Sequence, residues 1–441
     1  MLIRFQSSVI AALAAAAVFT SGCGGGLSGA LPAPPAGVSN DPSPPMGAKI
    51  ITSSVTRASW VPVHVQNYTF WQYDGVGTGI PASYMAAWAT WVLTAQSSYA
   101  NEFHAAGGKY TVAYTDPNYY YVGPGYKAPG YYPESAFGHG SNGTRTQRPE
   151  GGGTEYYLNP ASLASQSGYL GIVRTIAANG GYNYIYADGV SDSLPMSLYR
   201  MWPTPVEITT STAYVGGMKA LLGASPLPII LNGYNNGSPL TEESEYIGAR
   251  SIGAGFGEGC FTNRTDVVTD TQYQQLWTGM ANALLATTSR GYPAICAGRG
   301  ELTDNRAERT YYLASWWLTY NAYHSVSFEL ISSPGNVYLF PEQAIVPTGP
   351  LATETNVANY KWWTGAYERR FDACYYKQVL WGACAAVVNP SWANTVRIPP
   401  STVYHHSLAL DNNNLYDGGQ ASLSTYVPTT LAPGTAVILF Q

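Results

Sequence analysis

Six polar side chains stand where short apolar stretches of this sequence give way to loop residues, and these positions could carry chemistry. They are Asp116, Asp188, Asn232, Glu258, Arg299 and Glu301. Carboxyl groups that face one pocket suit glycoside hydrolysis, because one must protonate the leaving oxygen while another attacks the sugar or activates water. The set shows no Ser-His-Asp order, and the histidines and cysteines lack the spacing of a zinc site. We therefore expect a carboxylate-based site with no metal and no cofactor.

Asp188 and Glu258 are the main catalytic candidates. Asp188 ends the apolar stretch 184–187 and precedes a glycine, and Glu258 lies between two glycines. A neighbouring glycine lets a bulky sugar approach the backbone closely. The alternative for Asp188 is structural, because Asp-Gly is a common turn pair. Asp116, which precedes a proline, is expected to shape its loop or to bind substrate. The remaining candidates, which bind sugar hydroxyls or hold the loops together, are Asn232, Arg299 and Glu301.

A long segment between Asp116 and Asn159 is rich in tyrosine, glycine and proline, and it is expected to be a functional loop. Its clustered tyrosines are Tyr119, Tyr120, Tyr121, Tyr126, Tyr131 and Tyr132. A tyrosine ring offers an apolar face and a hydroxyl, which suits stacking on a sugar. We expect Tyr120 and Tyr131 to bind substrate. The alternative is that these rings pack the loop onto the barrel.

Short apolar strands alternate with helices from about residue 60 onward. The expected strands are 110–114, 184–187, 227–231, 252–256, 292–297 and 326–330, and the expected helices are 163–178, 213–222, 270–288 and 306–323. Regular alternation predicts an α/β fold with a parallel sheet, and at this length a (β/α)₈ TIM barrel over 60–340 is the economical closure. A doubly wound open sheet is disfavoured, because no Gly-rich phosphate turn follows the first strand. Short strand-like runs after that predict a small antiparallel β-domain over 341–441.

Several short motifs give the chain a resemblance to uncharacterised glycosyl hydrolase families. The motifs are YIYADGV at 184–190, IILNG at 229–233, GFGEGCF at 255–261, YERRF at 367–371 and VVNPS at 387–391. In this order they resemble the hypothetical glycosyl hydrolase family fifteen over residues 60–441, and the polygalactosaminidase-like barrels are a related alternative. The resemblance implies a retaining mechanism in which Asp188, closing strand four, is the nucleophile. It also implies that Glu258, at strand six, is the acid/base.

The first 48 residues predict export. A positively charged start and an alanine-rich apolar stretch lead to TSGC at 20–23, which resembles a bacterial lipobox in which Cys23 is lipidated. Thr20 replaces the usual leucine, so plain secretion is the alternative to a lipid anchor. The apolar stretch is too short to span a bilayer. We expect a signal peptide over 1–23 and a flexible Gly/Pro/Ala/Ser linker over 24–48.

The cysteines agree with an oxidising location. Apart from Cys23 the chain has four, an even number. We favour a Cys374–Cys384 disulfide across a short hairpin. We also favour a Cys260–Cys296 disulfide between two neighbouring strands.

Composition limits the partners of the protein. Of the 441 residues 46% are hydrophobic and 11% are charged, with a net charge of −5. A disordered chain would be less apolar and more charged, and a nucleic-acid binder would show a basic stripe. We expect an exported, monomeric glycoside hydrolase of the cell envelope that acts on carbohydrate, contacts no nucleic acid and meets the membrane only through an N-terminal lipid. The alternative is a non-catalytic carbohydrate-binding or structural surface lipoprotein on the same scaffold.

Overall fold

The computed structural model describes about three fifths of the chain. The described residues are 66–71, 82–83, 86, 90–94, 97–122, 132–140, 142–150, 153–188, 211–232, 252–257, 260–261, 269–298, 305–322, 325–329, 340–349, 354–398, 400–413 and 419–441.

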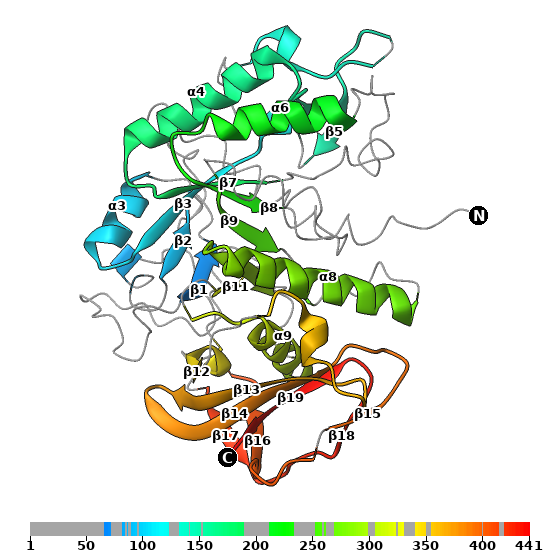
Figure 1. Cartoon of the computed structure of the whole chain (residues 1–441). Helices are drawn as coiled ribbons and strands as arrows, with labels where there is room; N and C mark the ends of the chain where they lie inside the picture. Colours follow the sequence, from blue (N-terminus) through cyan, green and yellow to red (C-terminus); the bar gives the residue numbers. More distant parts are fainter. Residues whose placement is uncertain are drawn as a thin grey trace, which may run out of the picture.

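Eight parallel strands form a closed ring (Figure 1). In chain order they are β1 (Gln66–Trp71), β2 (Trp91–Leu93), β3 (Tyr110–Thr115), β7 (Tyr184–Ala187), β8 (Ile229–Asn232), β9 (Ile252–Gly257), β10 (Ala294–Gly298) and β11 (Ser325–Glu329). Each strand pairs with its neighbour in chain order, and β11 pairs with β1. The ring confirms the parallel barrel and excludes the doubly wound open sheet.

Five α-helices in the described residues follow the second, third, fourth, sixth and seventh strands of the ring. They are α3 (Ser97–Ala105), α4 (Leu163–Asn179), α6 (Ser211–Gly223), α8 (Asp270–Ser289) and α9 (Arg306–Leu318). Ser162, Thr269 and Asn305 cap α4, α8 and α9 by accepting a backbone N–H. Most residues after the first, fifth and eighth strands lie outside the described ranges, so the complete alternation of eight helices stays a prediction.

The barrel strands alternate between an inward and an outward face, as the two-residue period of a strand requires. The inward side chains form one cluster: Trp91, Leu93, Tyr110, Val112, Tyr114, Tyr184, Tyr186, Ile230 and Ile295. The outward ones join the helices in the main core: Ala113, Ile185, Ala187, Ile229, Leu231, Ala294 and Cys296. The inward face therefore carries two tyrosines on each of two adjacent strands, Tyr110 and Tyr114 on β3 and Tyr184 and Tyr186 on β7.

The segment between β3 and α4 is not the irregular loop that the sequence predicted. It forms a three-stranded antiparallel sheet, here called the small sheet, in the order β4 (Tyr119–Val122), β6 (Gly153–Tyr157) and β5 (Gln147–Glu150), together with the short 3₁₀ helix η1 (Glu134–Ala136). The pairing sets Tyr119 opposite Tyr157 and Tyr120 opposite Tyr156. Aromatic cross-strand pairs stabilise a sheet, and this explains why a tyrosine-rich segment is ordered.

The C-terminal part forms the predicted antiparallel β-domain. Its main sheet has the order β12 (Ile345–Thr348), β13 (Tyr367–Tyr376), β14 (Val379–Asn389), β19 (Thr435–Phe440), β16 (His406–Leu410) and β17 (Ala421–Ser424). A second pair consists of β15 (Val396–Arg397) and β18 (Thr430–Leu431), and two 3₁₀ helices precede β12 and β13: η4 (Pro341–Ala344) and η5 (Val357–Tyr360). The boundary at 340/341 stays a prediction.

Helix α9 packs against β14 and β19 and joins the barrel to the β-domain (Figure 1). Buried Arg369 of β13 donates from Nη1 to the carbonyl oxygens that end this helix: Trp317, Leu318 and Tyr320. The last carbonyls of a helix lack the regular partner four residues on, and that of Trp317 also accepts the backbone N–H of Tyr320 at 3.2 Å. The bonds end α9 at Leu318, five residues before the predicted end at Tyr323. The YERRF motif thus has a structural role.

Two more contacts fix this junction. Buried Arg309 of α9 donates from Nε to Glu342 Oε1 at 2.6 Å and from Nη2 to Oε2. Asp270 at the start of α8 accepts the backbone N–H of Trp392 at 2.5 Å and the hydroxyl of Ser391 at 3.0 Å. Ser391 belongs to the VVNPS motif, so this motif also holds the domains together.

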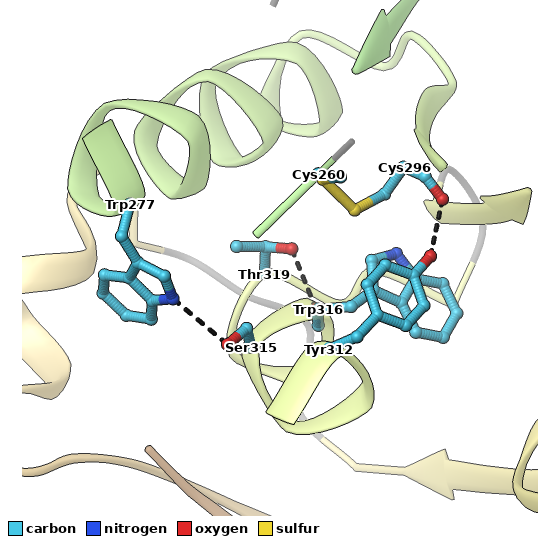
Figure 2. The surroundings of a disulfide bond; sticks show 7 residues. All are labelled: Cys260, Trp277, Cys296, Tyr312, Ser315, Trp316 and Thr319. Carbon is cyan, nitrogen blue, oxygen red and sulfur yellow. Dashed lines mark hydrogen bonds between the residues drawn. A yellow bond between two sulfur atoms is a disulfide. The ribbon is translucent and has the colours of Figure 1, made fainter. Parts of the chain in front are cut away.

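Both favoured disulfides are present. Cys374 and Cys384 join β13 to β14, with Cα atoms 5.9 Å apart. Cys260, three residues past β9, joins Cys296 on β10, with Cα atoms 5.5 Å apart. Figure 2 shows the hydroxyl of Tyr312 on α9 donating to the carbonyl oxygen of Cys296, at 2.6 Å. Among the described residues no helix is long and apolar enough to cross a membrane.

Candidate functional site

Asp188 lies at the carboxyl end of β7 with its side chain held from the adjacent strand. Its backbone N–H donates to the carbonyl oxygen of Thr115 at 3.0 Å, which continues the parallel pairing of β3 and β7. The hydroxyl of Tyr114 donates to Asp188 Oδ2 at 2.6 Å. The Tyr114 ring stacks on Tyr186 with centroids 5.7 Å apart. The carboxyl group is therefore oriented by an inward tyrosine of the barrel, which a simple turn aspartate would not require.

Asp116 follows β3 beside Asp188. Its Oδ1 accepts the backbone N–H groups of Asn118 at 2.8 Å and Tyr119 at 3.1 Å, so the predicted loop-shaping role is present. Burial raises the pKa of Asp116 well above its usual range, and the nearby carboxyl groups of Asp188 and Glu155 raise this pKa further. The two backbone N–H bonds oppose this rise without cancelling it.

The small sheet turns a polar and aromatic face toward Asp116. Glu155 of β6 and Arg148 of β5 form a buried ion pair, with Arg148 Nε 2.5 Å from Glu155 Oε2. The guanidinium carbon of Arg148 lies 5.4 Å from the ring centroid of half-buried Tyr119. Tyr119 is paired with Tyr157, two residues from Glu155 on β6, so Tyr119 and Glu155 lie on the same face of the small sheet. The carboxyl group of Glu155 raises the pKa of Asp116, which shows that this face is turned toward Asp116.

The opposite face of the small sheet is a core, and it changes the expectation for Tyr120. Tyr120 is 9% exposed, and its ring meets the rings of Tyr132 and Phe137 edge-on at 5.3 and 5.9 Å. The cluster also contains Leu158 and packs against Ala164 of α4. Tyr120 therefore has the packing role that was the alternative to sugar binding.

The other predicted residues fall largely outside the described part of the chain. Asn232 is the last residue of β8, and only its backbone belongs to the described part of the structure. The positions that lie outside it are Cys23, Tyr131, Glu258, Arg299 and Glu301.

Three residues of this site were not singled out from the sequence. Tyr114 could have been found, because it lies two residues before Asp116 in a strand and so shares its face. The ion pair of Arg148 with Glu155 carries no local signal, since its members come from two strands of a segment that reads as a loop. No group of three or more His, Cys, Asp or Glu in the described ranges could hold a metal ion.

No family model matches the chain, and no curated protein matches it. Among solved structures, a family 27 β-L-arabinopyranosidase from Geobacillus stearothermophilus is 11% identical, with 88% of this chain and 99% of that chain covered and a TM-score of 0.42. A xylosidase from Aspergillus niger is 9% identical over 87% of this chain and 65% of that one, with a TM-score of 0.42. An α-amylase from Malbranchea cinnamomea is 9% identical over 88% and 97%, with a TM-score of 0.38. These neighbours are glycoside hydrolases, but at such TM-scores the chemistry of this chain must be argued from its own site.

Proposed function

We propose that this protein is a glycoside hydrolase whose nucleophile is Asp188. The observation that carries the proposal is the 2.6 Å hydrogen bond from Tyr114 to Asp188 at the carboxyl end of two adjacent barrel strands. Catalytic groups of parallel barrels stand at this end. A short O–H···O bond to a carboxylate orients the group and stabilises its charged form. A nucleophile at an anomeric carbon requires both.

Asp116 is poorly placed to be the acid/base of this reaction. It projects beside Asp188 from the adjacent strand, and adjacent strands lie about 4.8 Å apart. Both groups would therefore approach a sugar from the same side, whereas the catalytic carboxyl groups must flank the scissile bond. Our candidate for the acid/base is Glu258, which follows β9, two strands around the ring from β7.

The proposed reaction proceeds in two steps. Asp188 attacks the anomeric carbon while Glu258 donates its proton to the leaving oxygen, which gives a glycosyl-enzyme and a free alcohol. Glu258 then takes a proton from the water that attacks the same carbon, and Asp188 leaves with its electron pair. This is the retaining course, and it needs carboxyl groups about 5–5.5 Å apart.

Tyr119 is the residue we propose as the sugar-contacting tyrosine of the small sheet. Its ring is half-buried and lies on the face that Glu155 and Arg148 share, next to Asp116. A ring fixed from one side by a guanidinium presents a rigid apolar surface for stacking. The charge of Arg148 is balanced by that of Glu155, so this face suits an uncharged ligand such as a neutral sugar.

We also propose that the protein is exported and held at the cell envelope by lipid on Cys23. The two disulfides are compatible with an oxidising compartment. Mass spectrometry of the mature N-terminus tests the anchor. A diacylated Cys23 is expected, and an unmodified N-terminus beyond Cys23 would leave secretion as the remaining form.

A screen of the purified full chain against 4-methylumbelliferyl glycosides and plant and microbial polysaccharides tests the function. We expect turnover of at least one substrate, and a loss of about 10³-fold or more in Asp188→Asn. Asp372→Asn, an exposed aspartate of β13, is the matched control and should keep full activity. Polysaccharide binding without turnover would favour the carbohydrate-binding alternative, and neither binding nor turnover would contradict both.

A further inference from the structure

Asp116 and Asp188 are brought to the same level of two adjacent barrel strands by the register of β3 and β7. Val112 is paired with Tyr184 and Tyr114 with Tyr186, all on the inward face. Two residues further along each chain come Asp116 and Asp188, and the bond from Asp188 N–H to the Thr115 carbonyl shows that the pairing continues to this point. Adjacent strands are separated by about 4.8 Å. These two residues are here called the carboxyl pair.

In the described part of the chain, titratable groups from a barrel strand, the small sheet and a helix face Asp116. Asp188 lies on the end of β7, and Glu155 lies on β6 of the small sheet. Tyr169 of α4, whose hydroxyl is 3.0 Å from Thr115 Oγ1, also faces Asp116. Arg148 of the small sheet is paired with Glu155. Asp116 thus has two acidic neighbours, and none of the ion pairs found among the described residues includes it.

The two members of the carboxyl pair are held differently. Asp188 accepts the Tyr114 hydroxyl at 2.6 Å, which stabilises its charged form. Within the described part of the chain, the hydrogen bonds that Asp116 accepts come from backbone N–H groups of its own loop. Carboxyl groups on adjacent strands that act on each other repel when both are ionised, so such a pair keeps one proton over a wide range of pH.

We propose that the carboxyl pair carries a single negative charge at neutral pH and that Asp116 holds the shared proton. Asp188 is then the charged member, with its Oδ2 fixed by Tyr114. Asp116, as a neutral acid, has an O–H that it can donate to Asp188 or to a ligand hydroxyl at the mouth of the barrel. The pair itself does not depend on the proposed function, although its use in orienting a nucleophile rests on that function.

A shared proton explains why residue 116 is an aspartic acid, which a role in shaping the loop does not. An asparagine would accept the same two backbone N–H groups, and it would do so without placing a third acidic group beside Asp188 and Glu155. A role confined to the loop therefore leaves the acid unexplained. A proton held next to a nucleophile needs the acid itself.

Infrared spectroscopy of the full chain over a pH series tests the proposal without any substrate. Wild type is expected to show the C=O band of a protonated carboxyl group at pH 7, and Asp116→Asn should lose it. In Asp188→Asn the band of Asp116 should disappear at lower pH than in wild type, because the neighbouring charge is gone. Asp372→Asn, which changes an exposed aspartate of β13, should leave the band unchanged.

Three results would overturn the proposal. They are no protonated carboxyl band in wild type at pH 7, a band that survives in Asp116→Asn, and a titration of Asp116 that is the same in Asp188→Asn as in wild type. The wild-type spectrum alone already decides the first point, so the test holds even if a variant fails to fold. Because no turnover is measured, a protein that hydrolyses no glycoside can still show the carboxyl pair, and an active one can lack it.

Discussion

Replacing Arg369 by methionine removes the charge that ties the β-domain to the end of α9 and keeps a side chain of similar length. Nη1 of Arg369 lies 3.2 Å from the carbonyl oxygens of Trp317 and Leu318 and 2.7 Å from that of Tyr320. Arg369 is 5% exposed, so water cannot replace the lost bonds without opening the junction. The guanidinium carbon also lies 4.8 Å from the ring centroid of Phe371.

The magnitude follows from these contacts. One nitrogen carries two hydrogens, so we count two full bonds from a charged donor, each contributing about 1.5–3 kcal/mol. Burial lowers the pKa of Arg369, and the desolvation cost behind that shift disappears with the charge and offsets part of the loss. We expect the free energy of unfolding to fall by about 3 kcal/mol.

Urea unfolding followed by tryptophan fluorescence measures this loss. Arg369→Lys, which keeps a charge with three donors, should recover part of the stability. Arg397→Met, at an exposed arginine of β15, is the matched control and should change the free energy of unfolding by less than about 0.5 kcal/mol. An Arg369→Met variant as stable as wild type would refute the assignment of this arginine to the junction.

Three further predictions concern the site and its supports. Tyr119→Ala should raise KM or weaken sugar binding with the fold intact, whereas Tyr120→Ala, in the core of the small sheet, should lower the free energy of unfolding by about 3 kcal/mol. Thermal melts and binding assays of both variants separate the two effects, and the reverse pattern would contradict both roles. Removing the Cys260–Cys296 disulfide should cost about 1 kcal/mol more than removing Cys374–Cys384, because the bridges span 36 and 10 residues; equal losses in denaturant would speak against this. Because the pKa of Asp116 is raised, the folded state keeps a proton that the unfolded chain releases. The stability of the folded protein therefore falls as pH rises from the usual pKa of 3.8 to the raised pKa of the folded state. Asp116→Asn should therefore gain on wild type by about 1.4 kcal/mol per pH unit across that window, and parallel stability curves at all pH values would contradict it.

Six of the eight barrel strands and four of the five described helices were predicted, because their patterns are local, whereas β1, β2 and α3 were not singled out. The strand 184–187 was placed to the residue, since burial on two faces leaves a continuous apolar run. Helix 163–178 was placed within one residue of its end from the helical spacing of its apolar residues. The disulfide partners were also predictable, because neighbouring strands and a hairpin bring the cysteines together.

The small sheet and the junction were not predictable, because their stability comes from contacts across the chain. Tyr119 and Tyr157 are 38 positions apart in the sequence and meet only in the sheet. Helix α9 was predicted to continue past Leu318, since nothing in its own sequence shows that Arg369 will bind its last carbonyls. At the site, Asp116 and Asp188 were both recognised as candidates, but the carboxyl pair depends on the register of β3 and β7, which a single strand does not encode.

Trapping the glycosyl-enzyme shows which carboxyl group is the nucleophile. The full chain is incubated with activated 2-deoxy-2-fluoro glycosides that match the substrates found in the screen, and the digested protein is analysed by mass spectrometry. We expect a glycosyl adduct on the peptide that contains Asp188, with no adduct in Asp188→Asn. An adduct on a different carboxyl group, or full hydrolysis by Asp188→Asn, would contradict the role of Asp188 as nucleophile.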